Sequence, residues 1–248
     1  IISLKEKGEN MGRAYEVRKA SIQKTGAAKA KLYSMYAREI YQAAKSGGVE
    51  LESNSVLKRL VERAHKEQVP NDIIKRAIDK VNSGVDEAYQ TVRYELFGPS
   101  GSTIIVECLT DNVNRSVSAV RAVVNKCHIK MGAIGSVMYM YENLSIIGFK
   151  GLDEEQVMDA FIEHDVDVKD MEENDGMIMV YGEPQDLFAM KEAIHAVDPK
   201  IEFEVDEITW LPKEKVTLSG EDKETFERTI HMLDECEDVN HIYHNVAQ

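Results

Sequence analysis

Four cations recur every seven residues near the start of the chain, and their type and spacing point to a binding chemistry. They are Lys24, Lys31, Arg38 and Lys45. Seven residues turn an α-helix through about 700°, so successive members drift by only about 20° and lie about 10 Å apart. If this stretch is one helix, the four cations form an exposed basic stripe that can follow a phosphate backbone and displace its counterions. The alternative is a solvated helix face without a binding role.

The charge of the chain is divided into two blocks of opposite sign. Residues 1–84 carry 17 Lys and Arg against 10 Asp and Glu, a net charge of +7, and residues 85–248 carry 13 against 34, a net charge of −21. From Arg18 to Lys45 the one carboxylate is Glu39, so nearby acids do not neutralise the stripe. This division indicates that the first block binds a polyanion and that the second block repels polyanions.

A second candidate site is the segment Asp111-Asn112-Val113-Asn114-Arg115, between a predicted strand and a predicted helix. Asn112 or Asn114 can cap the helix. The helix N-terminus can also bind an anion, with Arg115 as a second contact, and both roles can hold at once. The predicted nucleic-acid-binding residues are therefore Arg13, Arg18, Lys19, Lys24, Lys29, Lys31, Arg38, Lys45 and Arg115.

Three weaker patterns have a structural interpretation that we favour. Gly132-Ala133-Ile134-Gly135 fits the GxxG loop that clamps a nucleic-acid backbone in KH domains, but it precedes a predicted strand and is typical of a turn. Tyr33, Tyr36 and Tyr41 indicate packing more than base stacking. The histidines His231, His241 and His244 indicate surface or packing positions, because His241 and His244 point to opposite faces of a predicted strand.

No catalytic motif is found in the sequence, so we expect no enzyme activity, no metal and no cofactor. The three cysteines Cys108, Cys127 and Cys236 are odd in number and far apart, which favours a reducing compartment and a cytoplasmic protein. No apolar run reaches the roughly 18 residues of a membrane span. Residues 1–10 precede Met11 and are interpreted as a vector remnant, outside the fold.

The hydrophobic periodicity changes from helical to alternating near residue 85. Helical spacing predicts a basic helical domain over 11–84, with Ser53 as the cap of its second helix. Alternating patterns then predict an α/β domain made of 85–142 and 214–248, including a strand over 136–142. Between its two parts, residues 143–213 follow the order β-α-β-β-α-β, which predicts an inserted ferredoxin-like domain. The fold class is therefore α+β: a helical domain followed by two α/β domains, the middle one discontinuous.

Several segments in a fixed order resemble the YebC family. They are Met11–Arg13, Ala43–Gly48, Val69-Pro70 with Ile78–Lys80, Tyr94–Gly101, Glu107–Arg115, Gly135–Tyr139 and Tyr243–Asn245. The family includes PmpR-type regulators and the mitochondrial translational activator of cytochrome c oxidase. The chain lacks the family's common opening, and Met-Gly-Arg-Ala-Tyr is closer to the YeeN-type branch. His128-Ile129 also replaces a Gly-Gly that is usual before the GxxG segment.

The resemblance implies a cytoplasmic, three-domain, nucleic-acid-binding regulatory protein. A DNA-binding transcriptional regulator is the first hypothesis. A ribosome-associated translation factor that contacts ribosomal RNA and relieves stalling on proline-rich sequences is the second, and the net charge of −14 is easier to reconcile with it than with non-specific binding to long DNA. The third is an acidic protein-interaction scaffold. No membrane partner is expected, and the sequence leaves the oligomeric state open.

Overall fold

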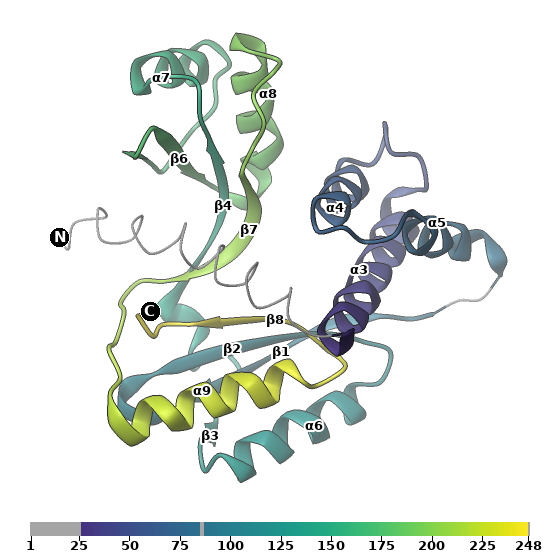
Figure 1. The fold of residues 1–248 in the computed structure, drawn as a ribbon, viewed down its shortest axis with the longest axis vertical. Helices are drawn as coiled ribbons and strands as arrows, with labels where there is room; N and C mark the ends of the chain where they lie inside the picture. Colours follow the sequence, from purple (N-terminus) through teal and green to yellow (C-terminus); the bar gives the residue numbers. More distant parts are fainter. Residues whose placement is uncertain (1–25, 85–86, 248) are drawn as a thin grey trace. The chain divides into compact units, whose positions relative to one another are not determined.

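The structure is a computed structural model, and it describes residues 26–84 and 87–247 (Figure 1). The predicted site residues Arg13, Arg18, Lys19 and Lys24 lie outside these ranges. The described residues form two compact units. The first consists of Met138–Thr217 and residues 245–247, and the second of residues 26–84, 87–137 and Leu218–His244.

The second unit begins with a helical head. Its elements are α3 (Gly26–Gly47), α4 (Ser55–Lys66), α5 (Asn71–Asp79) and the 3-10 helix η1 (Lys80–Ser83). Apolar residues at helical spacing from all three α-helices share one core, which includes Tyr36, Ile40, Leu57 and Ile74. Burial of such a stripe supplies most of the stability of short helices. Tyr36 and Tyr41 are 1% and 2% exposed, so packing is their role, as predicted.

Asn54, and not the predicted Ser53, caps α4. Its Oδ1 accepts from the Leu57 amide at 3.0 Å, and its Nδ2 donates to the carbonyls of Ala43 and Gly48 at 2.9 and 2.8 Å. The predicted cap, Ser53, donates to the Glu50 carbonyl instead. Asn54 therefore joins the end of α3 to the start of α4, which a hydroxyl group at position 53 could not do.

We expect Asn54→Ala to destabilise the second unit by about 2 kcal/mol, because the cap is lost and two carbonyls lose their donor. Asn54→Asp keeps the cap acceptor but places a carboxylate oxygen against the Ala43 and Gly48 carbonyls, so it should cost at least as much. Thermal unfolding followed by circular dichroism measures both. Equal stability of Asn54→Ala and the natural chain would contradict this assignment.

The same unit contains a four-stranded antiparallel sheet in the order β3-β1-β2-β8. Its elements are β1 (Gln90–Phe97), β2 (Thr103–Thr110), α6 (Val113–Lys126), β3 (Lys130–Met131), α9 (Gly220–Asp234) and β8 (Val239–His244). The 3-10 turn η2 (Pro99–Gly101) joins β1 to β2. Helices α6 and α9 lie on the same face of the sheet (Figure 1), so β8 and α9 complete a layer that begins 130 residues earlier.

The strand predicted over 136–142 is wrong. Residues Met138–Met140 form the 3-10 helix η3, and a strand begins only at Tyr141. The reason is Glu95, whose carboxylate accepts from the amides of Gly135 and Val137, both at 2.5 Å. These amides are the donors that a strand would need, so the backbone turns here, with Gly135 at φ 84°. The turn interpretation of the GxxG segment is thereby confirmed.

The first unit is a ferredoxin-like domain with a sheet in the order β5-β6-β4-β7, all pairs antiparallel. Its elements are β4 (Tyr141–Phe149), α7 (Glu154–Glu163), β5 (Asp170–Asn174), β6 (Met177–Gly182), η4 (Pro184–Asp186), α8 (Leu187–Val197) and β7 (Val205–Pro212). Both α-helices pack on the face that carries Ile147 and Phe149. The β5–β6 hairpin turns at Asp175-Gly176, both at positive φ, as a two-residue hairpin turn requires.

The predicted α+β class, with helices first and two α/β layers after them, is confirmed. The separation of the helical head from the first sheet as a domain of its own stays a prediction, because head and sheet belong to one compact unit. Within the described ranges, no helix is both long and apolar enough to cross a membrane.

Candidate nucleic-acid interface

The described part of the basic stripe is only partly open to solvent: Lys45 is exposed, Lys31 is half-buried and Arg38 is buried. Lys31 Nζ donates to the main-chain carbonyl of Asp234 and forms an ion pair with its carboxylate at 3.1 Å. Lys45 Nζ donates to the Glu87 carbonyl at 3.0 Å. The heptad spacing does place these cations on one face of α3, and their partners lie at the end of α9, in the α9–β8 loop and at residue 87 of the same unit.

Arg38 departs most from the expected exposed cation, because it is only 8% exposed. Its Nη2 donates to the Glu237 carbonyl at 2.7 Å, and its Nη1 lies 3.4 Å from the Asp238 carboxylate. The expectation that the whole stripe is exposed is therefore wrong at Arg38. Its guanidinium links the helical head to the loop between α9 and β8, whose acidic residues supply the partner.

Asp238 is the centre of this contact, and its side chain is only 5% exposed. It accepts from Arg115 at 2.6 and 2.9 Å, from Ser116 at 2.8 Å and from Thr110 at 3.1 Å. Burial alone would raise the pKa of this carboxyl, but the hydrogen bonds from Arg115, Ser116 and Thr110 outweigh burial and lower it. We call Asp238 with Arg38, Thr110, Arg115 and Ser116 the Asp238 cluster.

The segment Asp111–Arg115 has the predicted cap. Asn112 Oδ1 accepts from the Arg115 amide at 3.1 Å and caps α6. The Arg115 side chain, 47% exposed, is shared between Asp238 and Asp111, the latter at 2.8 Å. Arg115 therefore keeps an exposed edge beside the helix N-terminus while its other edge is fixed in the Asp238 cluster.

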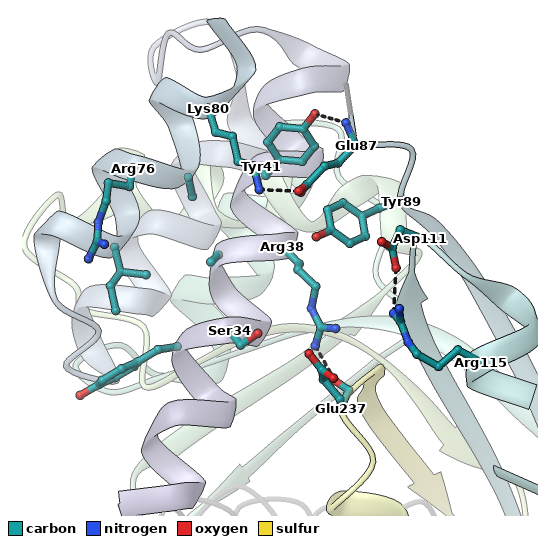
Figure 2. Close-up of a pocket in the computed structure, with 14 residues that line it drawn as sticks. Ser34, Arg38, Tyr41, Arg76, Lys80, Glu87, Tyr89, Asp111, Arg115 and Glu237 are labelled. Carbon is teal, nitrogen blue, oxygen red and sulfur yellow. Dashed lines mark hydrogen bonds and ion pairs between the residues drawn. The ribbon is translucent and has the colours of Figure 1, made fainter. Parts of the chain in front are cut away.

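A groove of about 520 Å³ opens where the head meets the sheet (Figure 2). Arg38 extends into it from α3, and Arg76 and Lys80 line it from α5 and η1. Tyr89 and Arg115 line the opposite side. The groove thus brings four cations from α3, α5, η1 and α6 together with aromatic rings and with the acidic residues Glu87, Asp111 and Glu237.

Two of the predicted site residues, Arg38 and Arg115, lie in this groove, whereas Lys29 is exposed elsewhere on α3. Arg76, Lys80 and Tyr89 also line the groove and are not among the residues predicted from the sequence. A signal for the first two was present, because cations four residues apart share one helix face. No sequence pattern pointed to Tyr89, which follows the change of periodicity and reaches the groove only through the fold.

The histidines follow the packing interpretation. His241 Nε2 lies 3.0 Å from Glu39, and the His244 ring packs edge-on against Phe226. Within residues 26–84 and 87–247, no group of three or more His, Cys, Asp and Glu could hold a metal ion.

Comparisons with known proteins agree with this architecture. The model of the TACO1/YebC protein N-terminal domain matches residues 13–84, and that of the TACO1/YebC second and third domain matches residues 89–246. A probable transcriptional regulatory protein of Marinobacter nauticus is 46% identical, covering 95% of this chain and 98% of that protein. One of Alteromonas mediterranea is 43% identical, covering 96% and 99%.

A solved structure has the same fold. The crystal structure of a conserved hypothetical protein from Aquifex aeolicus matches with a TM-score of 0.73 and 30% sequence identity, covering 91% of this chain and 94% of that one. The family models together span most of the chain, and the relatives are similar over nearly their whole length. This chain therefore belongs to the TACO1/YebC family.

Proposed function

We propose that this protein is a regulatory protein that binds nucleic acid through the groove and the exposed cations of its helical head, with DNA as the first target. The observation that carries the proposal is the convergence of Arg38, Arg76, Lys80 and Arg115 on one groove. The names of the relatives, probable transcriptional regulatory proteins, support a role in regulation.

The rim cations are available for exchange with phosphate. Arg76 pairs with Asp72 and Lys80 with Glu87, and in the first pair both side chains are more than half exposed. Exposed ion pairs contribute only about 0–1 kcal/mol, so replacing a carboxylate by a phosphate costs little. Arg38 is different, because its buried pair with Asp238 fixes it in the floor of the groove.

We propose that the protein acts by binding and not by turnover. The strongest potential nucleophiles in the sequence are the cysteine thiols. Cys108 is fully buried. Burial raises the pKa of Cys108 to about 12 and also raises that of Cys236. A thiol at such a pKa is protonated at neutral pH and is a poor nucleophile.

The salt dependence of DNA binding tests the proposal. Replacing both Arg76 and Lys80 by Gln should lower the log–log salt slope for a DNA duplex by about 2 units, at about 0.9 per phosphate contact. Folding should survive, since Gln, Lys and Arg have similar helix propensities. Fluorescence anisotropy over a salt series measures the slope.

The matched control replaces Lys150 and Lys223 by Gln, which removes the same charge from exposed positions outside the groove. Its slope should stay within about 0.5 unit of the natural chain, because neither lysine contacts a phosphate in this proposal. Equal slopes for the two double variants would remove the groove from the binding surface.

The ribosome-associated hypothesis rests on one further observation. Residues 85–248 carry a net charge of −21, which repels a long duplex passing close to them but is compatible with inserting the head into a ribosomal site. Sedimentation of a cell extract separates the two hypotheses. Co-sedimentation of the protein with ribosomes that is lost at high salt favours the ribosome hypothesis. Absence of co-sedimentation favours DNA.

A further inference from the structure

We propose that the groove receives one unpaired nucleotide of a single-stranded nucleic acid, with its base against Tyr89 and its phosphates on the rim cations. This inference rests on the proposed function and adds to it the form of nucleic acid that the groove recognises. The volume of about 520 Å³ lies within the range of about 300–1,000 Å³ that small ligands occupy.

Arg38, which lines the groove, carries a buried donor without a partner. Arg38 is 8% exposed and uses both terminal nitrogens, but its Nε has no hydrogen-bond partner. A buried donor without a partner is unfavourable, so an acceptor that reaches it stabilises the site. The carbonyl oxygens and ring nitrogens of a nucleobase are acceptors of the kind that Nε lacks, whereas the carboxylates nearby are already bonded to other donors.

The aromatic wall is held in place for stacking. Tyr89 is partly exposed, and Tyr41 packs edge-on against it, with ring centroids 5.9 Å apart and planes at 77°. Burial, together with the nearby Glu87 carboxylate, raises the pKa of Tyr89 to about 12, so its ring stays neutral. A fixed, neutral ring beside cations is the usual surface on which an unpaired base stacks.

The rim supplies the phosphate contacts on both sides of this wall. Lys80 Nζ lies 2.6 Å from Glu87, and Arg115 Nη2 lies 2.8 Å from Asp111 (Figure 2). Both carboxylates are at least partly exposed, so they can turn to water when a phosphate arrives. Cations on opposite sides of a stacking ring fit a strand that enters on one side and leaves on the other.

The chemistry of the groove excludes a paired base from the same position. In a duplex both faces of each base are stacked and its Watson–Crick edge is hydrogen-bonded, so neither Tyr89 nor Arg38 Nε could reach it without base flipping. The groove should therefore prefer single strands even if the outer cations of the head contact a duplex.

The experiment uses the full chain and a 12-nucleotide strand that carries one 2-aminopurine, alone or annealed to its complement. Tyr89→Leu should weaken single-strand binding by about 5- to 150-fold, the loss of about 1–3 kcal/mol of stacking. It should change duplex binding less than twofold. Tyr89→Phe keeps the ring and should bind the single strand within about threefold of the natural chain.

The control Tyr139→Leu removes a 63% exposed tyrosine that does not line the groove, and it should leave both affinities unchanged. If circular dichroism shows that Tyr89→Leu is unfolded, the 2-aminopurine fluorescence change in the natural chain and in Tyr89→Phe tests the inference instead. No fluorescence change on binding means that the base does not enter the groove, and overturns the inference.

The other outcomes separate the two proposals. If the chain binds duplex and single strand equally and Tyr89→Leu has no effect, the inference of an unpaired nucleotide in the groove is overturned. The proposed nucleic-acid function would remain intact. Displacement of the strand by inorganic phosphate as effectively as by AMP indicates a simple anion site and also overturns the inference. A natural chain that binds neither strand form contradicts both proposals.

Discussion

Replacing Asp238 by Ala is expected to destabilise the unit that contains the head by about 3 kcal/mol, because removing one member of a buried ion pair leaves its partner's charge uncompensated. Arg38 has a side-chain exposure of 9% and would keep only main-chain and amide partners. Thr110 would lose its acceptor as well, and Ser116 would keep only the Asn112 carbonyl. Thermal unfolding by calorimetry measures the loss.

Asp234 provides the matched control for this prediction. It also pairs with a stripe cation, Lys31, but its side chain is 73% exposed. Asp234→Ala should change the stability by no more than about 0.5 kcal/mol. A similar loss for Asp234→Ala and Asp238→Ala would mean that overall charge, and not the buried cluster, stabilises the contact between head and sheet.

The same cluster predicts a pH dependence. The folded-state pKa of Asp238 is lowered, so its contribution is fully present above the pKa of an unfolded Asp, about 3.9. It is lost as the pH falls from there through the folded-state pKa. The stability difference between the natural chain and Asp238→Asn should therefore be constant from pH 7 to about pH 5 and shrink below about pH 4. A difference that shrinks between pH 7 and pH 5 would implicate another group.

The basic stripe shows what a sequence can and cannot predict about a site. Helical spacing correctly places Lys31, Arg38 and Lys45 on one face of α3, because that follows from 3.6 residues per turn. It cannot say what covers that face. The partner of Arg38 lies 200 residues further along the chain, and only the fold brings Asp238 back beneath α3.

The ferredoxin-like unit was accessible to prediction for the opposite reason. Its order β-α-β-β-α-β lies in one continuous stretch, and its hairpin turn carries Asn-Asp-Gly at the expected place. Local patterns therefore carry nearly all of its topology. The groove, like the partners of the basic stripe, could not be predicted from local patterns. Tyr89, Arg76 and Arg115 come from separate segments, so no local stretch of sequence contains the site.

Glu95 is the residue where local pattern and structure disagree most. In an alternating strand, a carboxylate beside Leu96 predicts a solvent-facing position, yet Glu95 is 4% exposed. The segment 132–137 covers it, and its amides at Gly135 and Val137 supply the hydrogen bonds that the buried carboxylate needs. The same turn presents Ile134, which is 98% exposed.

Glu95→Ala should therefore free the segment 132–137, at a cost of about 2–3 kcal/mol for two hydrogen bonds to a buried charge. Amide hydrogen exchange should accelerate at Gly135 and Val137, which lose their acceptor, but not at Ile105, across from Glu95 in β2. Acceleration throughout β1 and β2 would instead mean that Glu95 stabilises the whole sheet. Mass spectrometry of exchanged peptides distinguishes the two.

Two further variants show whether the carboxylate itself holds the turn. Glu95→Gln keeps one acceptor oxygen and should recover part of the protection at these two amides. Glu107→Ala removes a neighbouring carboxylate that pairs with Arg93, whose side chain is 42% exposed, and should leave the turn unchanged because such pairs contribute only about 0–1 kcal/mol. Protection at Gly135 and Val137 that survives Glu95→Ala would show that packing of Val137, which is fully buried, is enough to hold the turn without the carboxylate.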